Sequence, residues 1–174
     1  ASDATHSKTL VDNWGNDYTT TMDIDPKVGH AVGMGVGRRW DNFDGELHFS
    51  YATLDYDSVT LLGATNYAAS GDMDVFQLGA RVGYGIPMGD SGWVRVAGGF
   101  GLGKRQDFIR IDQISQAYSS NETSFTYDLL FSLGYETQMG LDAFLAYRLL
   151  GISSNGEFGK MAMHLFELGL GSNF

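Results

Sequence analysis

The segment from Lys160 to Phe174 alternates its side chains with a period of two, and this limits the fold more than any other feature of the chain. A period of two with one apolar face indicates a β-strand, because a helix repeats its apolar positions every three to four residues. We therefore expect a two-faced strand. Its apolar face carries Ala162, Phe166, Leu168 and Leu170, and its other face carries Glu167, Gly169, Gly171 and Asn173.

The same alternation recurs in earlier segments, separated by connections that are short and long in turn. Short connections such as Pro87 to Gly92 are made of turn-forming residues, and long ones such as Gln113 to Glu122 are polar. Antiparallel neighbours joined in this way indicate an all-β, up-and-down sheet. The predicted strands are Val28 to Trp40, Gly45 to Tyr56, Asp74 to Ile86, Trp93 to Arg110, Thr123 to Glu136, Leu141 to Leu150 and the terminal segment.

Composition limits the class of protein further. The 174 residues suffice for one domain, 1–174, and the chain contains no cysteine, so disulfides and thiolate metal sites are excluded. No apolar run reaches the roughly 18 residues of a transmembrane helix. A membrane crossing would therefore use strands closed into a barrel, since only helices and closed barrels satisfy every backbone group in lipid. The net charge of −10 argues against a nucleic-acid partner.

The number of strands is decided by parity. Single-chain bacterial barrels have an even number of strands, and the pattern above gives seven. We expect an eighth strand within Lys8 to Asp23, where apolar residues alternate poorly. The alternative is an odd number of strands, with residues 1–27 forming an N-terminal extension or a plug.

The cost of burying charge in lipid decides which face points outward. Arg81, Arg95, Asp128 and Arg148 share the glycine-rich face, and a basic group at the bilayer midplane costs roughly 2–4 kcal/mol. The apolar face should therefore meet lipid, whereas a soluble ligand-binding barrel would turn it inward. Aromatic residues should anchor the rim near the short turns, as amphipathic rings do at membrane interfaces. This predicted girdle comprises Trp40, Tyr84, Trp93, Tyr135 and Phe174.

Two motifs and the last residue resemble a known family. The glycine-rich run from Gly33 to Trp40, the segment Gly45 to Tyr51 after a tight turn, and the terminal Phe174 are similar to small bacterial outer-membrane barrels of the opacity-protein and outer-membrane protein A transmembrane-domain type. The resemblance covers about residues 28–174 and departs from the family at Ser172 and in the weak first strand. It implies eight strands with short periplasmic turns and longer extracellular loops. It also implies a location in the bacterial outer membrane. Because Ala1 to Asp3 lack a basic and apolar leader, we expect a mature chain from which a signal peptide has been removed.

Charged residues on the inner face form the candidate site. In an eight-stranded barrel the interior is just wide enough for side chains to fill it, so opposite charges there should pair and close the bore. We expect a structural plug, with a narrow ion-conducting pore made by re-pairing of the same groups as the alternative. The predicted network comprises Glu46, His48, Arg81, Arg95, Asp128, Glu136, Asp142, Arg148 and Glu167.

A weaker alternative is an enzyme that modifies lipid A. Glu46, His48 and Ser50 share one face of one strand, and His-x-Ser resembles the local motif of outer-membrane lipid A deacylases. In that family the pair faces lipid, whereas here the neighbouring Leu47 and Phe49 claim the lipid face. We therefore expect a non-enzymatic barrel with no catalytic, cofactor or metal site.

The predicted roles lie at the cell surface. They are a structural protein of the envelope, an adhesin-like scaffold for loops, or an accessory subunit of a membrane complex. The expected partners are outer-membrane lipid, lipopolysaccharide, and a protein bound through the loops or the barrel wall.

Overall fold

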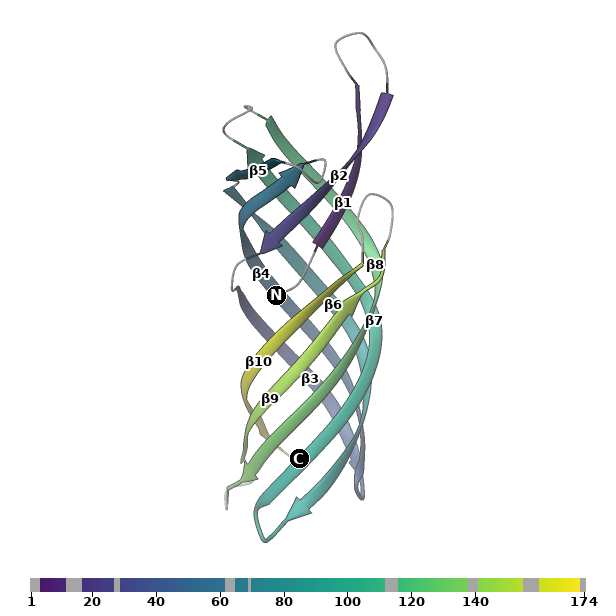
Figure 1. Cartoon of the computed structure of the whole chain (residues 1–174). Helices are drawn as coiled ribbons and strands as arrows, with labels where there is room; N and C mark the ends of the chain where they lie inside the picture. The colour runs from purple at the N-terminus through teal and green to yellow at the C-terminus, as the bar shows by residue number, and fades with distance from the viewer. Residues whose placement is uncertain are drawn as a thin grey trace.

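The computed structural model describes residues 4–11, 17–26, 29–61, 65–68, 70–111, 116–137, 141–154 and 160–172. These residues form ten strands and no helix, and Figure 1 shows them as a tall, tilted wall with a hairpin above it. Among the described residues, no helix is long and apolar enough to span a membrane. The strands are β1 (Ala4–Val11), β2 (Asp17–Pro26), β3 (His30–Trp40), β4 (Phe43–Leu61), β5 (Thr65–Ala68), β6 (Ser70–Met88), β7 (Gly92–Ile111), β8 (Gln116–Glu136), β9 (Leu141–Ile152) and β10 (Met161–Ser172).

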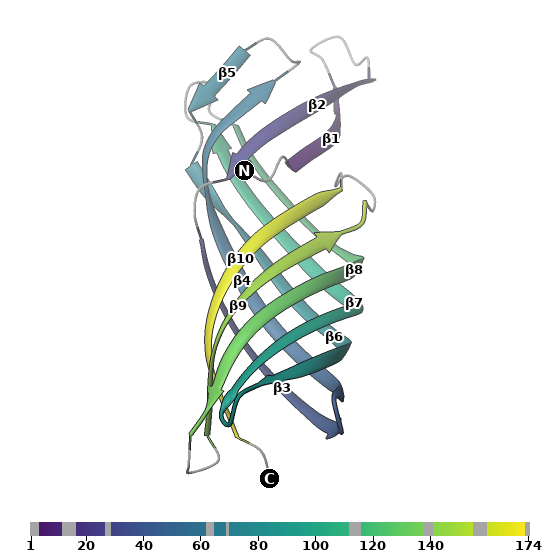
Figure 2. The ribbon, with the colours of Figure 1, turned by 60° about the horizontal axis from the view of Figure 1, so that its bottom comes forward.

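Seven of these strands build the wall, in the order β3, β4, β6, β7, β8, β9, β10, and every neighbouring pair is antiparallel. The all-β, up-and-down architecture predicted from the sequence is therefore confirmed. Short turns lie at the end of the wall where the chain also ends (Figure 2). Trp40 pairs with Phe43 across the turn at Asp41, which has a φ of 54°. Gly89 opens the turn between β6 and β7 with a φ of 69°, a conformation that glycine adopts without strain.

The two faces of the wall differ as the alternation predicts. On β6, Leu78 is 65% exposed on the outside, whereas the adjacent Gln77 is 1% exposed and points inward. Phe100, Leu102 and Leu129 are likewise exposed on the outer face of β7 and β8. A continuous exposed apolar surface of this kind is unfavourable in water and suits hydrocarbon.

Strand length divides the wall into two sides. The strands β4, β6, β7 and β8 contain 19, 19, 20 and 21 residues, whereas β3, β9 and β10 contain 11, 12 and 12. A tilted strand crosses a bilayer with about 9–11 residues. The short strands thus match one membrane crossing, and the long strands project beyond it at the end opposite the short turns (Figure 1).

The described residues 4–11 and 17–26, which overlap the eighth strand predicted within Lys8 to Asp23, form the paired strands β1 and β2 above the wall (Figure 1). Strand β2 pairs with the far end of β4, from Met22–Leu61 to Pro26–Tyr56. Within the described residues, β3 pairs with β4 and β10 pairs with β9, and no strand lies between β3 and β10. In this structure the hairpin therefore lies beside the far end of β4 and not between β3 and β10.

Candidate functional site in the barrel interior

Asp128 is the centre of the charged interior. Its carboxylate is 2% exposed and lies on the inner face of β8. Arg81 from β6 donates to both of its oxygens, at 3.1 Å from Nε and 3.0 Å from Nη2. Arg148 from β9 donates from Nη2 at 2.8 Å, and His48 Nε2 from β4 lies 3.3 Å from the same oxygen. Two-pronged arginine–carboxylate pairs are among the stronger hydrogen bonds in proteins, so Asp128 joins three strands across the lumen.

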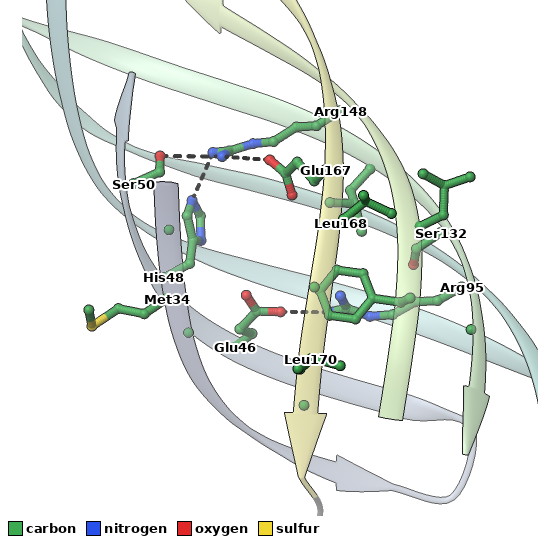
Figure 3. Close-up of a pocket in the computed structure, with 18 of the residues that line it drawn as sticks. Met34, Glu46, His48, Ser50, Arg95, Ser132, Arg148, Glu167, Leu168 and Leu170 are labelled. Carbon is green, nitrogen blue, oxygen red and sulfur yellow. Dashed lines mark hydrogen bonds and ion pairs between the residues drawn. The ribbon is translucent and has the colours of Figure 1, made fainter. Parts of the chain in front are cut away.

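A second carboxylate, Glu46, extends this network toward the short-turn end. Glu46 lies 3.3 Å from Arg81 Nη1 and accepts from Arg95 Nη2 at 3.0 Å. Arg95 also donates to both oxygens of Asp44, with 2.9 Å between Nε and Oδ2. On the other side of the lumen, Arg148 Nη1 lies 3.5 Å from Glu167 on β10 (Figure 3). Each of the three arginines therefore contacts carboxylates of two different residues.

Uncharged polar groups continue the network toward the projecting end. Ser50 Oγ donates to Gln77 Oε1 at 3.1 Å, and Gln77 Nε2 donates to Thr126 Oγ1 at 3.1 Å. Arg148 donates to Ser50 Oγ at 3.3 Å and to the Gln77 oxygen. The hydrogen bonds of Ser50 thus go to Gln77 and Arg148. His48 Nε2 faces Arg148 and Asp128, so the two residues do not form the hydrogen-bonded pair that a serine nucleophile requires.

The predicted network is only partly assembled by these contacts. Glu136 lies exposed at the short-turn end, and Asp142 is buried at the start of β9. Asp44, which the sequence assigned to a turn, belongs to the network. Asp44 lies two residues before Glu46 and four before His48, so alternation turns it inward with them. This was missed because Asp41 to Asp44 was interpreted as a turn. The structure brings together Glu46, His48, Arg81, Arg95, Asp128, Arg148 and Glu167.

An apolar layer covers the network on its projecting side. Met73, Val75, Ile109, Leu150 and Met163 point inward from four strands and are all at most 2% exposed. Close to this layer along β7, Arg105 Nε donates to Asp107 Oδ1 at 2.9 Å, and both residues are buried. Sequence analysis did not single out this pair, although both residues lie within the predicted strand Trp93 to Arg110 and share the inward parity of Arg95. The layer and the network together place inward-facing side chains at two levels of the interior.

Three residues of the predicted aromatic girdle lie on the outer face of the wall. Trp40, Tyr84 and Tyr135 are 54%, 42% and 59% exposed on the outer face near the short turns. Phe174 lies outside the described residues. The prediction for Trp93 was wrong: Trp93 shares its face with Arg95, so it points inward and lines the interior cavity. Its ring lies 6.4 Å from that of Phe144 and occupies the space that a side chain at Gly134 would need.

A cavity of about 1130 Å³ occupies the lower interior and reaches the gap between β3 and β10. Glu46, His48, Arg95 and Arg148 line it, together with Ser132 (Figure 3). His48 Nδ1 and Ser132 Oγ are buried in it without a hydrogen-bond partner among the described residues. The described residues contain no group of three or more histidine, aspartate or glutamate side chains placed to hold a metal ion.

The sequence matches the family described as "Outer membrane protein beta-barrel domain" over residues 3–174. The chain belongs to this family. The outer face of this barrel is apolar as the family's membrane location requires, and the protein resides in the bacterial outer membrane.

Two solved structures resemble this outer-membrane barrel. Neisserial surface protein A (NspA) superposes with a TM-score of 0.54 at 18% identity, covering 99% of this chain and 94% of the other, so the likeness concerns the fold. Ail, the attachment invasion locus protein of Yersinia pestis, gives a TM-score of 0.47 at 14% identity over 99% of this chain and 95% of its own. No curated protein matches the sequence.

Proposed function

We propose that this protein is a non-enzymatic surface barrel whose interior is closed to solutes and whose projecting strands bind a macromolecule outside the cell. The observation that carries the proposal is the set of arginine–carboxylate pairs that crosses the lumen between β4, β6, β8 and β9. A barrel interior joined in this way has no open route for solutes. The function of the molecule then depends on the parts that contact water outside the membrane.

The projecting strands support this proposal. On the outer face of β7, Leu102 is followed by Lys104, and on β8 Phe125 is preceded by Thr123, which pairs with Lys104. Above that level β7 and β8 continue for several more register pairs, as far as Ile111 and Gln116. Membrane crossing does not require this extra length. The projecting β-sheet therefore supplies a rigid support for loops at the cell surface.

A narrow pore is the second candidate, favoured by the surplus of partners around each arginine. Arg81 contacts Glu46 and Asp128, and Arg148 contacts Asp128 and Glu167. An arginine with two carboxylates in reach can move from one to the other at a small change in free energy. Such exchange would open a narrow path without leaving a charge unpaired.

Planar bilayers containing the refolded protein distinguish these candidates. The closed barrel is expected to stay silent, and Arg148→Gln together with Arg81→Gln is expected to produce conductance because the plug is weakened. A matched variant, Arg110→Gln, changes an exposed arginine on the projecting part of β7 and should stay silent. Conductance of the unchanged protein that responds to neutralisation of Arg81 would favour the pore.

Surface binding needs its own experiment on intact cells. Residues 110–117 would be replaced by an Asn-Gly turn, which shortens the β7–β8 connection while the membrane-crossing pairs remain. We expect cells that display the unchanged protein to adhere to immobilised extracellular glycans or matrix proteins, and cells with the shortened variant to lose adhesion. Equal adhesion of both, at equal amounts of folded protein, would contradict binding through this region.

A further inference from the structure

Arg38 is a charged residue on the outer face of the wall, near the short-turn end. It shares the parity of Met34 and Val36, which are exposed on that face of β3. Along β7 the apolar band ends at Lys104, and between that level and the short turns Arg38 is the single arginine or lysine on the described outer face. Since β3 spans one membrane crossing with 11 residues and ends at Trp40, Arg38 lies on the membrane side of this interfacial tryptophan.

The charge of Arg38 has no carboxylate partner among the described residues. Its register partner on β4 is Gly45, and the acidic neighbours Asp44 and Glu46 point inward, where they pair with arginines of the interior network. Asp41 lines the small cavity at the short-turn end. A charged side chain at the edge of hydrocarbon is costly unless it reaches the interface and meets an opposite charge. The counter-charge for Arg38 therefore has to come from outside the protein.

Trp40 and Gly45 give the guanidinium a defined place. The six-membered ring of Trp40 leans over Gly45, because its Cζ3 atom lies 3.2 Å from the position that a Cβ at residue 45 would take. The Arg38 guanidinium carbon lies 5.9 Å from the centroid of the Trp40 ring, within the range of a cation–π contact. This contact uses the face of the guanidinium and leaves its N–H groups directed outward in the plane, available to an acceptor.

We propose that Arg38 and Trp40 bind the phosphate group of an anionic phospholipid in the periplasmic leaflet. A guanidinium offers two parallel N–H donors that match two phosphate oxygens, and the indole beside it suits the headgroup level. A zwitterionic lipid also brings an ammonium group, for which the described outer face offers no carboxylate beside Arg38. A lipid with net negative charge, such as phosphatidylglycerol, fits the site better.

Native mass spectrometry of the refolded protein in a non-ionic detergent tests this proposal. Equal amounts of phosphatidylglycerol and phosphatidylethanolamine would be added, and the unchanged protein is expected to retain phosphatidylglycerol in preference. Arg38→Gln should weaken this binding about tenfold, which corresponds to about 1.4 kcal/mol, the scale of a hydrogen bond to a charged group. Arg38→Lys should lie between the two, because an ammonium keeps the charge without the planar pair of donors.

Arg39→Gln is the matched control. It removes the same charge at the next position of the chain, but Arg39 faces the small cavity at the short-turn end with Asp41. Its phosphatidylglycerol affinity should equal that of the unchanged protein. Equal losses at residues 38 and 39 would reduce the effect to net charge and overturn the site. Equal retention of the two lipids, or displacement of phosphatidylglycerol by inorganic phosphate, would also overturn it.

Urea unfolding in vesicles gives a second readout. A lipid that binds the folded state alone stabilises it, so phosphatidylglycerol added to phosphatidylcholine vesicles should raise the unfolding midpoint of the unchanged protein and of Arg39→Gln. The midpoint of Arg38→Gln should not respond to phosphatidylglycerol, and a response equal to that of the control would contradict the proposal.

A variant of the second partner covers the case in which Arg38→Gln fails to give the shifted band of a folded barrel on an unheated gel. Trp40→Leu keeps the charge of Arg38 and removes the aromatic contact. It should weaken phosphatidylglycerol binding about two- to fivefold, the scale of an exposed cation–π contact. Unchanged binding would overturn the proposal. These readouts are independent of conductance and adhesion.

Discussion

Strands β7 and β8 differ from β9 and β10 in length, and the difference separates two tasks within one wall. The pair β9 and β10 contains 12 residues each, enough for one crossing, whereas β7 and β8 contain 20 and 21. Along β7 the outer face changes from Phe100 and Leu102 to Lys104. The outer face of the lower part of β7 and β8 therefore suits lipid, and the outer face of their upper part suits water.

The largest expected effect comes from removing the shared acceptor in the lower interior. Asp128→Asn leaves Arg81 and Arg148 buried without their central carboxylate, and breaking a buried pair on one side costs about 3–5 kcal/mol. Urea unfolding in lipid vesicles, followed by gel migration, measures the free energy of unfolding. Asp90→Asn, in the exposed turn after β6, should change it by less than about 0.5 kcal/mol. Equal effects of the two changes would mean that the interior pairs contribute no more to the free energy of unfolding than an exposed residue does.

An arginine scan of one outer face compares lipid with water directly. Leu129→Arg places a charge in the apolar band of β8 and should cost about 2–4 kcal/mol. Phe108→Arg makes a comparable change on the projecting part of β7 and should cost less than about 1 kcal/mol, because its surroundings are aqueous. The same unfolding measurement applies. A large penalty at Phe108 would place that level inside the membrane and would remove the projecting region.

Crowding beneath the network should have an intermediate effect. Gly134→Val puts a branched side chain where the Trp93 ring lies, and overpacking of this kind costs roughly 1–3 kcal/mol. The double variant Gly134→Val with Trp93→Ala should recover part of the loss, which a double-mutant cycle measures. Additive losses would show that the two side chains do not compete for the same space.

The smallest expected effect has the opposite sign. Asp55 and Asp72 are directly opposed register partners on β4 and β6, and both are exposed. Like charges in such positions repel, so Asp72→Asn should stabilise the protein by roughly 0.2–1 kcal/mol at low salt. Adding salt should remove the gain by screening. A salt-independent change would point to a cause other than repulsion.

The sequence predicted the lipid-facing part of the wall well, because lipid imposes one apolar face on every strand. It predicted the upper part poorly. The region from Gln113 to Glu122 was interpreted as a polar loop, yet β8 begins at Gln116. In this part of β8 the inner face is polar as well, with Glu122 part-buried and Ser124 buried, so the apolar and polar alternation by which strands are recognised is lost.

The sequence predicted which charged side chains point into the interior, but it did not predict which of them pair. Inward positions of Arg81, Arg95, Asp128 and Arg148 followed from alternation, whereas the partners of each arginine depend on strand order and register. Trp93 was assigned to the interface from its residue type although its position shares the parity of Arg95. At that site residue preference and periodicity disagreed, and periodicity was the better guide.

The neighbour-only pairing from β6 to β10 also has a consequence for how the protein is made. Each of these strands finds its partner in the next segment of the chain, so the hairpins between them are local and can be added one after another. Local contacts shorten the conformational search and favour fast assembly. In a wall that closes within the membrane, the seam beside β3 and β10 would join distant segments of the chain. The last seam to form is therefore expected to set the pace of biogenesis.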